Sequence, residues 1–278
     1  SIFFYFFILR IRRPPRSTPF PYPTLFRSNV DFSEEQKLLQ STARDFLTKQ
    51  SSLAHVREIF EANAGYSEGL WKGVAELGWL GVAIPEEYGG AGYGYLELAM
   101  IAGEIGNALA PIPFGSTVYL AAEAITKEGS ADQKKQYLTG IASGDLIGTL
   151  ATNEKAGALT EDSVTTTFAD GKLSGTKLPV ADGDLANFAI VLAKEASGLS
   201  LVIVDLAAEG VTRTRLDSLD PTRSQAKLEF VDVPAARLGA EGNGWAIVSD
   251  VLNRAAVLMA FEQLGSAHRA FQITFDFL

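Results

Sequence analysis

The spacing of apolar residues along the chain changes twice, and each change predicts a change of secondary structure. From Ser33 to Ser143 apolar residues recur every three or four positions, which is typical of amphipathic helices packed against one another. The Ser130-Ala-Asp-Gln133 pattern matches a capping box, in which two side chains satisfy free backbone groups at the start of a helix. We therefore expect an all-helical N-terminal domain over residues 29–144, with a first helix from the capping box Ser33-Glu-Glu-Gln36 and further helices at about 53–60, 67–77, 95–109, 114–128 and 130–143.

After Gly144-Asp145 the apolar period falls from 3.6 residues to two, which predicts β-strands. A strand at 163–169 is followed by the turn residues Asp170-Gly171 and a partner strand at 172–176. The stretch KLPVADGDLANF, residues 177–188, has the appearance of a long connection between two strands. We expect a small antiparallel β-barrel or sandwich as a middle domain over residues 145–240, with further strands at 188–194, 200–205, 211–215 and 226–231.

The helical period resumes after Gly244. We expect Ile247, Val248, Val251, Leu252, Ala255 and Leu258 to lie on one helical face, and the pattern continues to the last residue, at position 278, without a cap or polar tail. We expect residues 241–278 to be the start of a C-terminal helical bundle, with the sequence ending inside that domain. The predicted fold class is thus α+β and multidomain.

The first 28 residues follow a different pattern. Their apolar run, Ile2–Leu9, precedes the arginines, whereas a signal peptide has the opposite order, and it is shorter than the roughly 20 residues of a membrane span. The IRRPPRST and TLFRS runs resemble translated sequencing-adapter DNA. We interpret residues 1–28 as an artefactual or disordered leader, with a membrane anchor or a transit peptide as the alternatives.

Composition excludes several kinds of chemistry. The chain of 278 residues has no Cys and two well-separated His, so thiol catalysis and a Cys-based or His-rich metal site are excluded. Its formal net charge is −9, and the predicted leader holds five Arg and no acid. Because nucleic acids and anionic membranes attract clustered Lys and Arg, we expect neither as a partner, and we expect a cytoplasmic location.

Four motifs occur in a defined order along the chain: LGWLGVAIPEEYGGAG at 77–92, GSADQKKQYLTGIASGD at 129–145, GTK at 175–177 and FVDVPAARLGAEGNGW at 230–245. With the helical, β and helical order of segments, the chain resembles the acyl-CoA dehydrogenase family over residues 29–278. The resemblance implies an FAD-dependent enzyme that oxidises the Cα–Cβ bond of an acyl-CoA thioester. It also implies an electron-transfer flavoprotein as electron acceptor, and a homotetramer or a heterotetramer with a related subunit.

The resemblance also assigns cofactor-binding residues. The family's flavin strand, T-E-P-x-A-G-S-D, falls on residues 152–159, and its K-x-W-I-T-N-G pattern falls on residues 177–183. In this chain Ala158 replaces the family's Ser, Pro179 replaces the Trp that packs on the flavin, and Ala181 replaces the Thr that hydrogen-bonds it. The residues assigned to FAD are therefore Thr152, Gly157, Ala158, Pro179, Val180 and Ala181.

Arg254 falls on an arginine that the family places near its active site, and the resemblance assigns it to substrate binding. Taken by itself, an Arg within an apolar helical stripe is equally well explained by a pair with a neighbour on its own helix. The catalytic base is not assigned, because Asn253 stands where a minority of the family carries its glutamate. In most members that glutamate lies nearer the C-terminus, which here means beyond Leu278.

Three functions are compatible with these residues. The first is flavin-dependent α,β-dehydrogenation of an acyl-CoA, although we expect the 278-residue chain as recorded to be inactive. The second is a flavin-poor or non-catalytic subunit of a heteromeric acyl-CoA dehydrogenase, favoured by Ala158, Pro179 and Ala181. The third is a non-enzymatic interaction protein that keeps the same fold.

Overall fold

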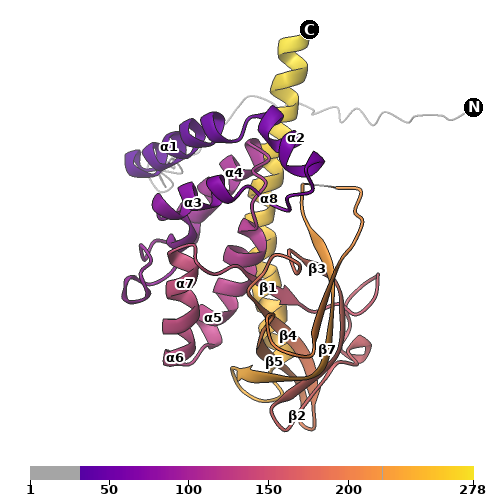
Figure 1. Cartoon of the computed structure of the whole chain (residues 1–278). Helices are drawn as coiled ribbons and strands as arrows, with labels where there is room; N and C mark the ends of the chain where they lie inside the picture. The colour runs from indigo at the N-terminus through magenta and orange to yellow at the C-terminus, as the bar shows by residue number, and fades with distance from the viewer. Residues whose placement is uncertain (1–31, 221) are drawn as a thin grey trace, which may run out of the picture. The chain divides into compact units, whose positions relative to one another are not determined.

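Helices form the first half of the chain (Figure 1). The computed structural model describes residues 32–220 and 222–278, so the predicted leader, 1–28, lies outside the described residues. The predicted helical segment contains α1 (Glu34–Gln50), α2 (Leu53–Glu61), α3 (Glu68–Glu76), α4 (Tyr95–Asn107), α5 (Glu123–Glu128), α6 (Ala131–Gln133) and α7 (Thr139–Ala142). Shorter helical turns η1 (Trp79–Gly81) and η2 (Glu86–Tyr88) and the wider turns η3 (Gly115–Ala122) and η4 (Lys134–Leu138) complete it.

Serine side chains fix where several of these helices begin. The hydroxyls of Ser52, Ser67 and Ser130 accept hydrogen bonds from backbone N–H groups in the first turns of α2, α3 and α6. These N–H groups have no partner inside the helix, so the serine caps stabilise each start. At Ser130 the full capping box predicted from the sequence is present.

The middle of the chain forms a closed β-barrel. Its strands are β1 (Gly148–Ala151), β2 (Thr167–Ala169), β3 (Lys172–Ala181), β4 (Phe188–Glu195), β5 (Gly198–Asp205), β6 (Val211–Arg215) and β7 (Gln225–Leu238). The ring runs β4, β2, β3, β7 and β5, and β5 pairs again with β4. All pairings are antiparallel except β1 with β4 and β2 with β4, which are parallel. The fold class predicted from the sequence, with helices before and after a small barrel, is confirmed.

Three predicted strand boundaries are wrong. Strand β7 continues to Leu238, well past the predicted end at 231, because its last residues pair with β5. Strand β2 starts at Thr167, because the preceding N–H groups of Thr165 and Thr166 donate to the Glu154 carboxylate instead of to a neighbouring strand. Strand β3 continues to residue 181, so residues 177–181 of the stretch predicted as a loop belong to this strand, and residues 182–187 connect β3 to β4. The ladder bulges between Lys177 and Val180, around Pro179, which lacks an N–H and follows a cis peptide bond.

The last element is the long helix α8 (Gly244–Phe277), which packs against α4. Among the described helices, α8 alone is long and apolar enough to cross a membrane by length and composition, and 33% of its most apolar window is buried. The expectation that no membrane is a partner stays a prediction. The predicted boundaries between three domains also stay predictions. Residues Glu34–Leu278 form one compact unit, and no division of this unit tests those boundaries.

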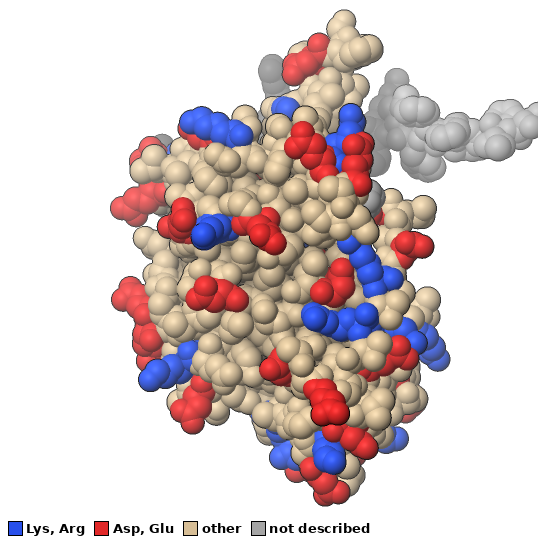
Figure 2. Space-filling model, viewed as in Figure 1, with Lys and Arg blue, Asp and Glu red and all other residues tan. Residues whose placement is uncertain are grey.

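Charged side chains of both signs are interspersed over the face shown in Figure 2, without a large basic patch. This distribution accompanies a formal net charge of −9 for the whole chain. The visible face therefore lacks the clustered Lys and Arg that a nucleic acid or an anionic membrane attracts.

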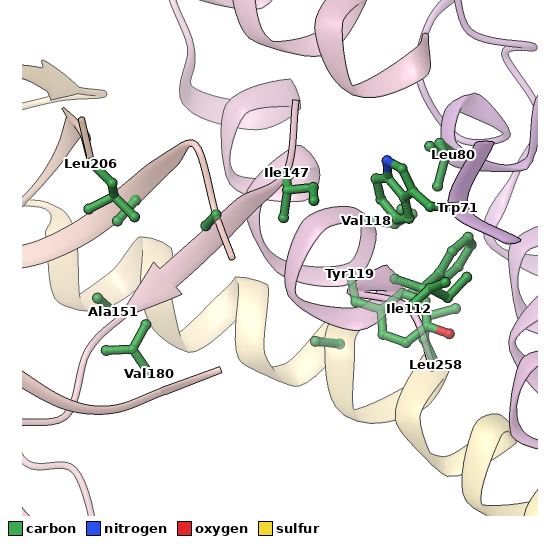
Figure 3. Close-up of a cluster of buried hydrophobic side chains, with 14 of the residues drawn as sticks. Trp71, Leu80, Ile112, Val118, Tyr119, Ile147, Ala151, Val180, Leu206 and Leu258 are labelled. Carbon is green, nitrogen blue, oxygen red and sulfur yellow. The ribbon is translucent and has the colours of Figure 1, made fainter. Parts of the chain in front are cut away.

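One apolar cluster joins the helices to the barrel (Figure 3). Trp71 and Tyr119 from the helices, Val180 from β3 and Leu258 from α8 all belong to it and are almost fully buried. Side chains packed at interior density shift only at a cost in free energy. The shared core therefore fixes the ends of β1 and β3 relative to the helices that precede them.

Candidate functional site

Two sequence segments that the motifs assign to the cofactor meet at one place on the barrel. The Leu178 N–H donates to the Asn153 carbonyl at 2.9 Å, and the Thr149 hydroxyl donates to the Ala181 carbonyl at 2.6 Å. These bonds join the chain that leaves β1 to the end of β3. We call residues 152–158 and 179–181 together the platform.

The first segment of the platform is a loop closed by its own side chains. The Thr152 hydroxyl lies 3.0 Å from the Asn153 side-chain oxygen, and the Asn153 amide donates to the Gly157 carbonyl at 3.4 Å. Gly157 has a φ of 116°, a conformation that side-chain-bearing residues rarely adopt. No described residue accepts a hydrogen bond from the backbone N–H groups of residues 155–158, and all four of these residues are exposed. Four backbone donors are therefore open to a ligand.

The second segment offers less to a ligand. Pro179 is exposed and brings a ring but no N–H, while the Val180 side chain is fully buried in the core. Ala181 is half-buried and its carbonyl already accepts from Thr149. Of the assigned residues on β3, Pro179 can therefore present its side chain to a planar ring, whereas Val180 can contribute backbone atoms only.

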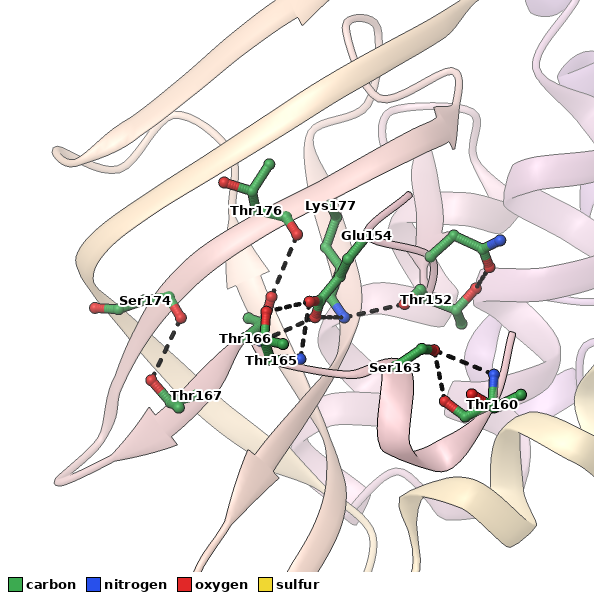
Figure 4. Close-up of polar contacts among 11 residues, drawn as sticks. Thr152, Glu154, Thr160, Ser163, Thr165, Thr166, Thr167, Ser174, Thr176 and Lys177 are labelled. Atoms are coloured by element: carbon green, nitrogen blue, oxygen red, sulfur yellow. Dashed lines mark hydrogen bonds and ion pairs between the residues drawn. The ribbon is translucent and has the colours of Figure 1, made fainter. Parts of the chain in front are cut away.

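A buried ion pair anchors the platform through Glu154 (Figure 4). The Lys177 ammonium, whose side chain is 0% exposed, donates to the Glu154 carboxylate at 2.8 Å and to the Thr152 carbonyl at 3.0 Å. Glu154 also accepts from the N–H of Thr165 at 2.8 Å, from its hydroxyl, and from the N–H of Thr166 at 2.9 Å. The pair thus links the end of β1, the strand β3 and the segment before β2.

The contacts of Glu154 determine its charge. Burial alone raises the pKa of a carboxyl, but the hydrogen bonds from Lys177, Thr165 and Thr166 outweigh burial and lower the pKa of Glu154 to about 2. Burial also lowers the pKa of Lys177, and Glu154 partly opposes this effect. Glu154 therefore stays ionised at neutral pH and holds its donors as a full negative charge.

Sequence reasoning did not find this ion pair. The signal that could have found it is the period of two in β3, which places Lys177 on the same face as the buried Leu173. A buried ammonium needs a carboxylate partner, and Glu154 is the acidic residue closest in sequence to the assigned Thr152. Gly175 lies between them on that face, where an added Cβ would lie 2.5 Å from the Thr166 hydroxyl oxygen, so glycine allows the close approach of Thr166.

A second buried carboxyl, also missed from the sequence, follows the platform directly. Asp182 accepts a hydrogen bond from the Ser116 hydroxyl at 2.6 Å, and its backbone N–H donates to the Ser224 carbonyl at 2.9 Å. Burial raises the pKa of Asp182 to about 6, against the opposing effects of Ser116 and the Arg223 charge. Asp182 therefore anchors the turn after β3 to η3 and to the segment before β7.

Arg254 lies in a separate cluster on the helices. Its guanidinium Nε lies 3.3 Å from the Asp250 carboxylate and 3.6 Å from that of Glu123, and the group stands 5.6 Å from the centre of the Tyr95 ring. Within the described part of the chain, no hydrogen bond or ion pair connects Arg254 to the platform. The structure thus contains an ion pair between Arg254 and Asp250 on the same helix, which is the alternative to substrate binding that the sequence left open. The 42% exposed side chain remains reachable from solvent.

No group of three His, Asp or Glu side chains within residues 32–220 and 222–278 is placed to hold a metal ion.

Comparison with known proteins identifies the family. The model of the acyl-CoA dehydrogenase N-terminal domain matches residues 33–145. The acryloyl-CoA reductase (NADH) of Anaerotignum propionicum is 30% identical over 269 residues, which cover 91% of this chain and 68% of the relative. The chain belongs to the acyl-CoA dehydrogenase family.

Solved structures of the family share the fold. The ChsE4-ChsE5 complex from Mycobacterium tuberculosis contains a chain 26% identical, with a TM-score of 0.78, covering 88% of this chain and 67% of that one. The acyl-CoA dehydrogenase complexed with FAD from Bacillus anthracis is 29% identical, with a TM-score of 0.79, covering 87% of this chain and 44% of that one. This acyl-CoA dehydrogenase chain therefore spans between 44 and 68% of the three proteins named.

Proposed function

We propose that this chain takes part in FAD-dependent α,β-dehydrogenation of an acyl-CoA thioester. The observation that carries the proposal is the platform, where the loop with four unpaired backbone donors at residues 155–158 is joined through Asn153 to Leu178, the residue before the exposed Pro179. A flavin has a planar ring edged with nitrogen and oxygen acceptors, so both features fit it. The relative from Bacillus anthracis is complexed with FAD. When bound, FAD supplies the acceptor for the hydride removed from the substrate.

The residues of the chain bind and orient in this proposal. The N–H groups of residues 155–158 donate to acceptors of the flavin, and the Pro179 ring covers part of its apolar face. Ala158 and Ala181 contribute no hydroxyl, and a hydrogen bond missing from a polar site costs about 1–3 kcal/mol. We therefore expect the flavin to be held mainly by backbone atoms, and more weakly than by a platform that has those hydroxyls.

Arg254 is the proposed contact to the acyl-CoA. Its guanidinium already faces Asp250 and Glu123, so a substrate has to compete with these carboxylates. Because an Arg has five N–H donors, it can bind a substrate oxygen while it keeps one carboxylate partner. We further propose an electron-transfer flavoprotein as electron acceptor and a tetramer as the assembly.

A second candidate function is a flavin-poor or non-catalytic subunit of a heteromeric dehydrogenase. Pro179 and Ala181 favour this candidate, because neither supplies the stacking or the hydrogen bond that the family pattern has at that position. The ChsE4-ChsE5 complex contains a relative in a two-component assembly. In such an assembly a partner subunit would supply a complete flavin site.

The proposed function is tested by mixing the full-length, flavin-bearing protein with acyl-CoA thioesters in the absence of oxygen, because the 278-residue chain as recorded is expected to be inactive. Short, long, branched and steroid-side-chain thioesters should be compared, and we expect at least one to bleach the visible flavin absorbance. Arg254→Met should raise the thioester concentration needed for half bleaching. A protein that keeps its flavin but is bleached by none of these thioesters would contradict the proposal.

A further inference from the structure

The Glu154 carboxylate is saturated by donors from three different segments. One oxygen accepts from Lys177 and from the N–H of Thr166, and the other accepts from the N–H and the hydroxyl of Thr165. A carboxylate has about four lone-pair positions, so all of them are occupied. Glu154 thus has no acceptor position left for a ligand, and its role is to hold other parts of the chain.

The residues that this carboxylate holds border the open backbone donors. Glu154 directly precedes residues 155–158, and its partner Lys177 also holds the carbonyl of Thr152 on the other side of Glu154. Lys177 in turn directly precedes the bulge that contains Pro179. The ion pair therefore ties together the start of the open loop and the start of the β3 segment of the platform.

We propose that Lys177 and Glu154 are positioning residues that preset the backbone donors of residues 155–158 for the flavin. The inference rests on the proposed function. A loop held mainly by one closing bond, from Asn153 to Gly157 at 3.4 Å, would lose freedom each time it bound a ligand. Anchoring the loop in advance removes part of that cost, which matters most where side-chain contacts to the ring are missing.

Three variants of the full chain test this role. Lys177→Met removes the ammonium and leaves Glu154 buried without its cation. The double variant Lys177→Met with Glu154→Gln also removes the buried charge, but the single acceptor oxygen of Gln can accept at most two of the three hydrogen bonds that Thr165 and Thr166 donate to the two oxygens of Glu154. Arg44→Met is the control, because it leaves the buried carboxylate of Glu104 without its cation in the helical part of the chain.

The readouts are flavin affinity by titration of the flavin-free protein, amide hydrogen exchange of residues 155–158, and thermal unfolding. We expect Lys177→Met to bind flavin at least about tenfold more weakly and to exchange faster at residues 155–158. The double variant should regain thermal stability without regaining flavin affinity. Arg44→Met should lose stability while flavin affinity stays within about twofold of the wild type.

Flavin affinity that recovers in step with stability in the double variant would overturn the inference, because the pair would then be merely structural. Unchanged flavin affinity and exchange in Lys177→Met would overturn it as well. A folded wild-type protein that binds no flavin would contradict the proposed function itself, and the inference would fall with it. The wild-type titration thus separates the two failures.

Discussion

At the scale of single residues, Asp182 shows how burial changes a side chain next to the platform. Its carboxyl is almost fully buried, and its pKa of about 6 lies well above the usual value of 3.8. Because the folded state binds the proton more tightly than the unfolded state, folding is favoured at low pH. That contribution is lost as the pH rises from 3.8 to about 6.

Replacing Asp182 with Asn should remove this pH dependence. The Asn oxygen can still accept from Ser116, Asn tolerates the φ of 53° at this position, and no charge is buried above pH 6. Relative to wild type, Asp182→Asn should be more stable by about 1–3 kcal/mol at roughly pH 8, and by much less at about pH 4. Denaturant unfolding at both pH values measures the difference.

Asp170→Asn provides a matched control. Asp170 also has a positive φ, of 50°, but it is exposed in the turn between β2 and β3. Its replacement should give the same small change in stability at both pH values. If Asp182→Asn behaved in that way too, burial of the carboxylate would not be the cause of the raised pKa.

At the scale of secondary-structure elements, the crossing of α4 and α8 depends on glycine. A Cβ at Gly106 would lie 1.9 Å from the backbone oxygen of Glu262, and one at Gly265 would lie 1.9 Å from that of Gly103. No side chain can take up these clashes, because the opposing atoms are backbone. The two helices therefore pack closely along these glycines, and α8 is held next to the segments that carry Tyr95 and Glu123.

Gly106→Ala should push the two helices apart. Overpacking of a core contact typically costs about 1–3 kcal/mol, and a clash with backbone lies at the upper end of that range or beyond it. Gly103→Ala is the matched control on the same helix. Its Cβ would lie 3.8 Å from the nearest opposing atom, which is an ordinary contact distance, and Ala stabilises a helix by about 1 kcal/mol relative to Gly. Thermal unfolding should show a clear loss for the first variant and no loss for the second.

The elements themselves could be predicted from the sequence to different degrees. The helices followed from the 3.6-residue period and the serine caps, because both signals are local. The end of β3 could not be predicted, since Pro179 and the turn residues after it are typical of a loop, whereas pairing of Val180 with Ala226 keeps the segment in the ladder. The start of β2 could not be predicted either. The N–H groups of Thr165 and Thr166, which precede the strand, donate to Glu154, eleven and twelve residues earlier in the sequence.

The same contrast holds for the site. The two segments of the platform were assigned by family resemblance, and the structure places them together through Thr149 and Asn153. The Lys177–Glu154 pair and the buried Asp182 were missed, because their environment depends on tertiary contacts. Arg254 was assigned to the substrate, with a pair on its own helix as the alternative; the structure contains that pair, with Asp250, and adds Glu123 on α5, which the sequence did not indicate.

At the scale of the whole molecule, α8 presents a large apolar surface in its second half. Leu264, Phe271 and Phe275 are each about two-thirds exposed. Exposed apolar surface of this kind marks association sites in soluble proteins. These side chains can be covered by further helices of the C-terminal bundle that the sequence predicts, or by another subunit of the proposed tetramer.

We propose above all that the backbone donors of the platform hold a flavin although Pro179 and Ala181 supply no polar side-chain contact. The flavin-to-chain ratio of the full-length protein, measured by visible absorbance after purification without any partner, tests this proposal. We predict about one flavin per chain. A folded protein without flavin would contradict the claim, and flavin that appeared only after co-expression with a related subunit would establish the heteromeric alternative.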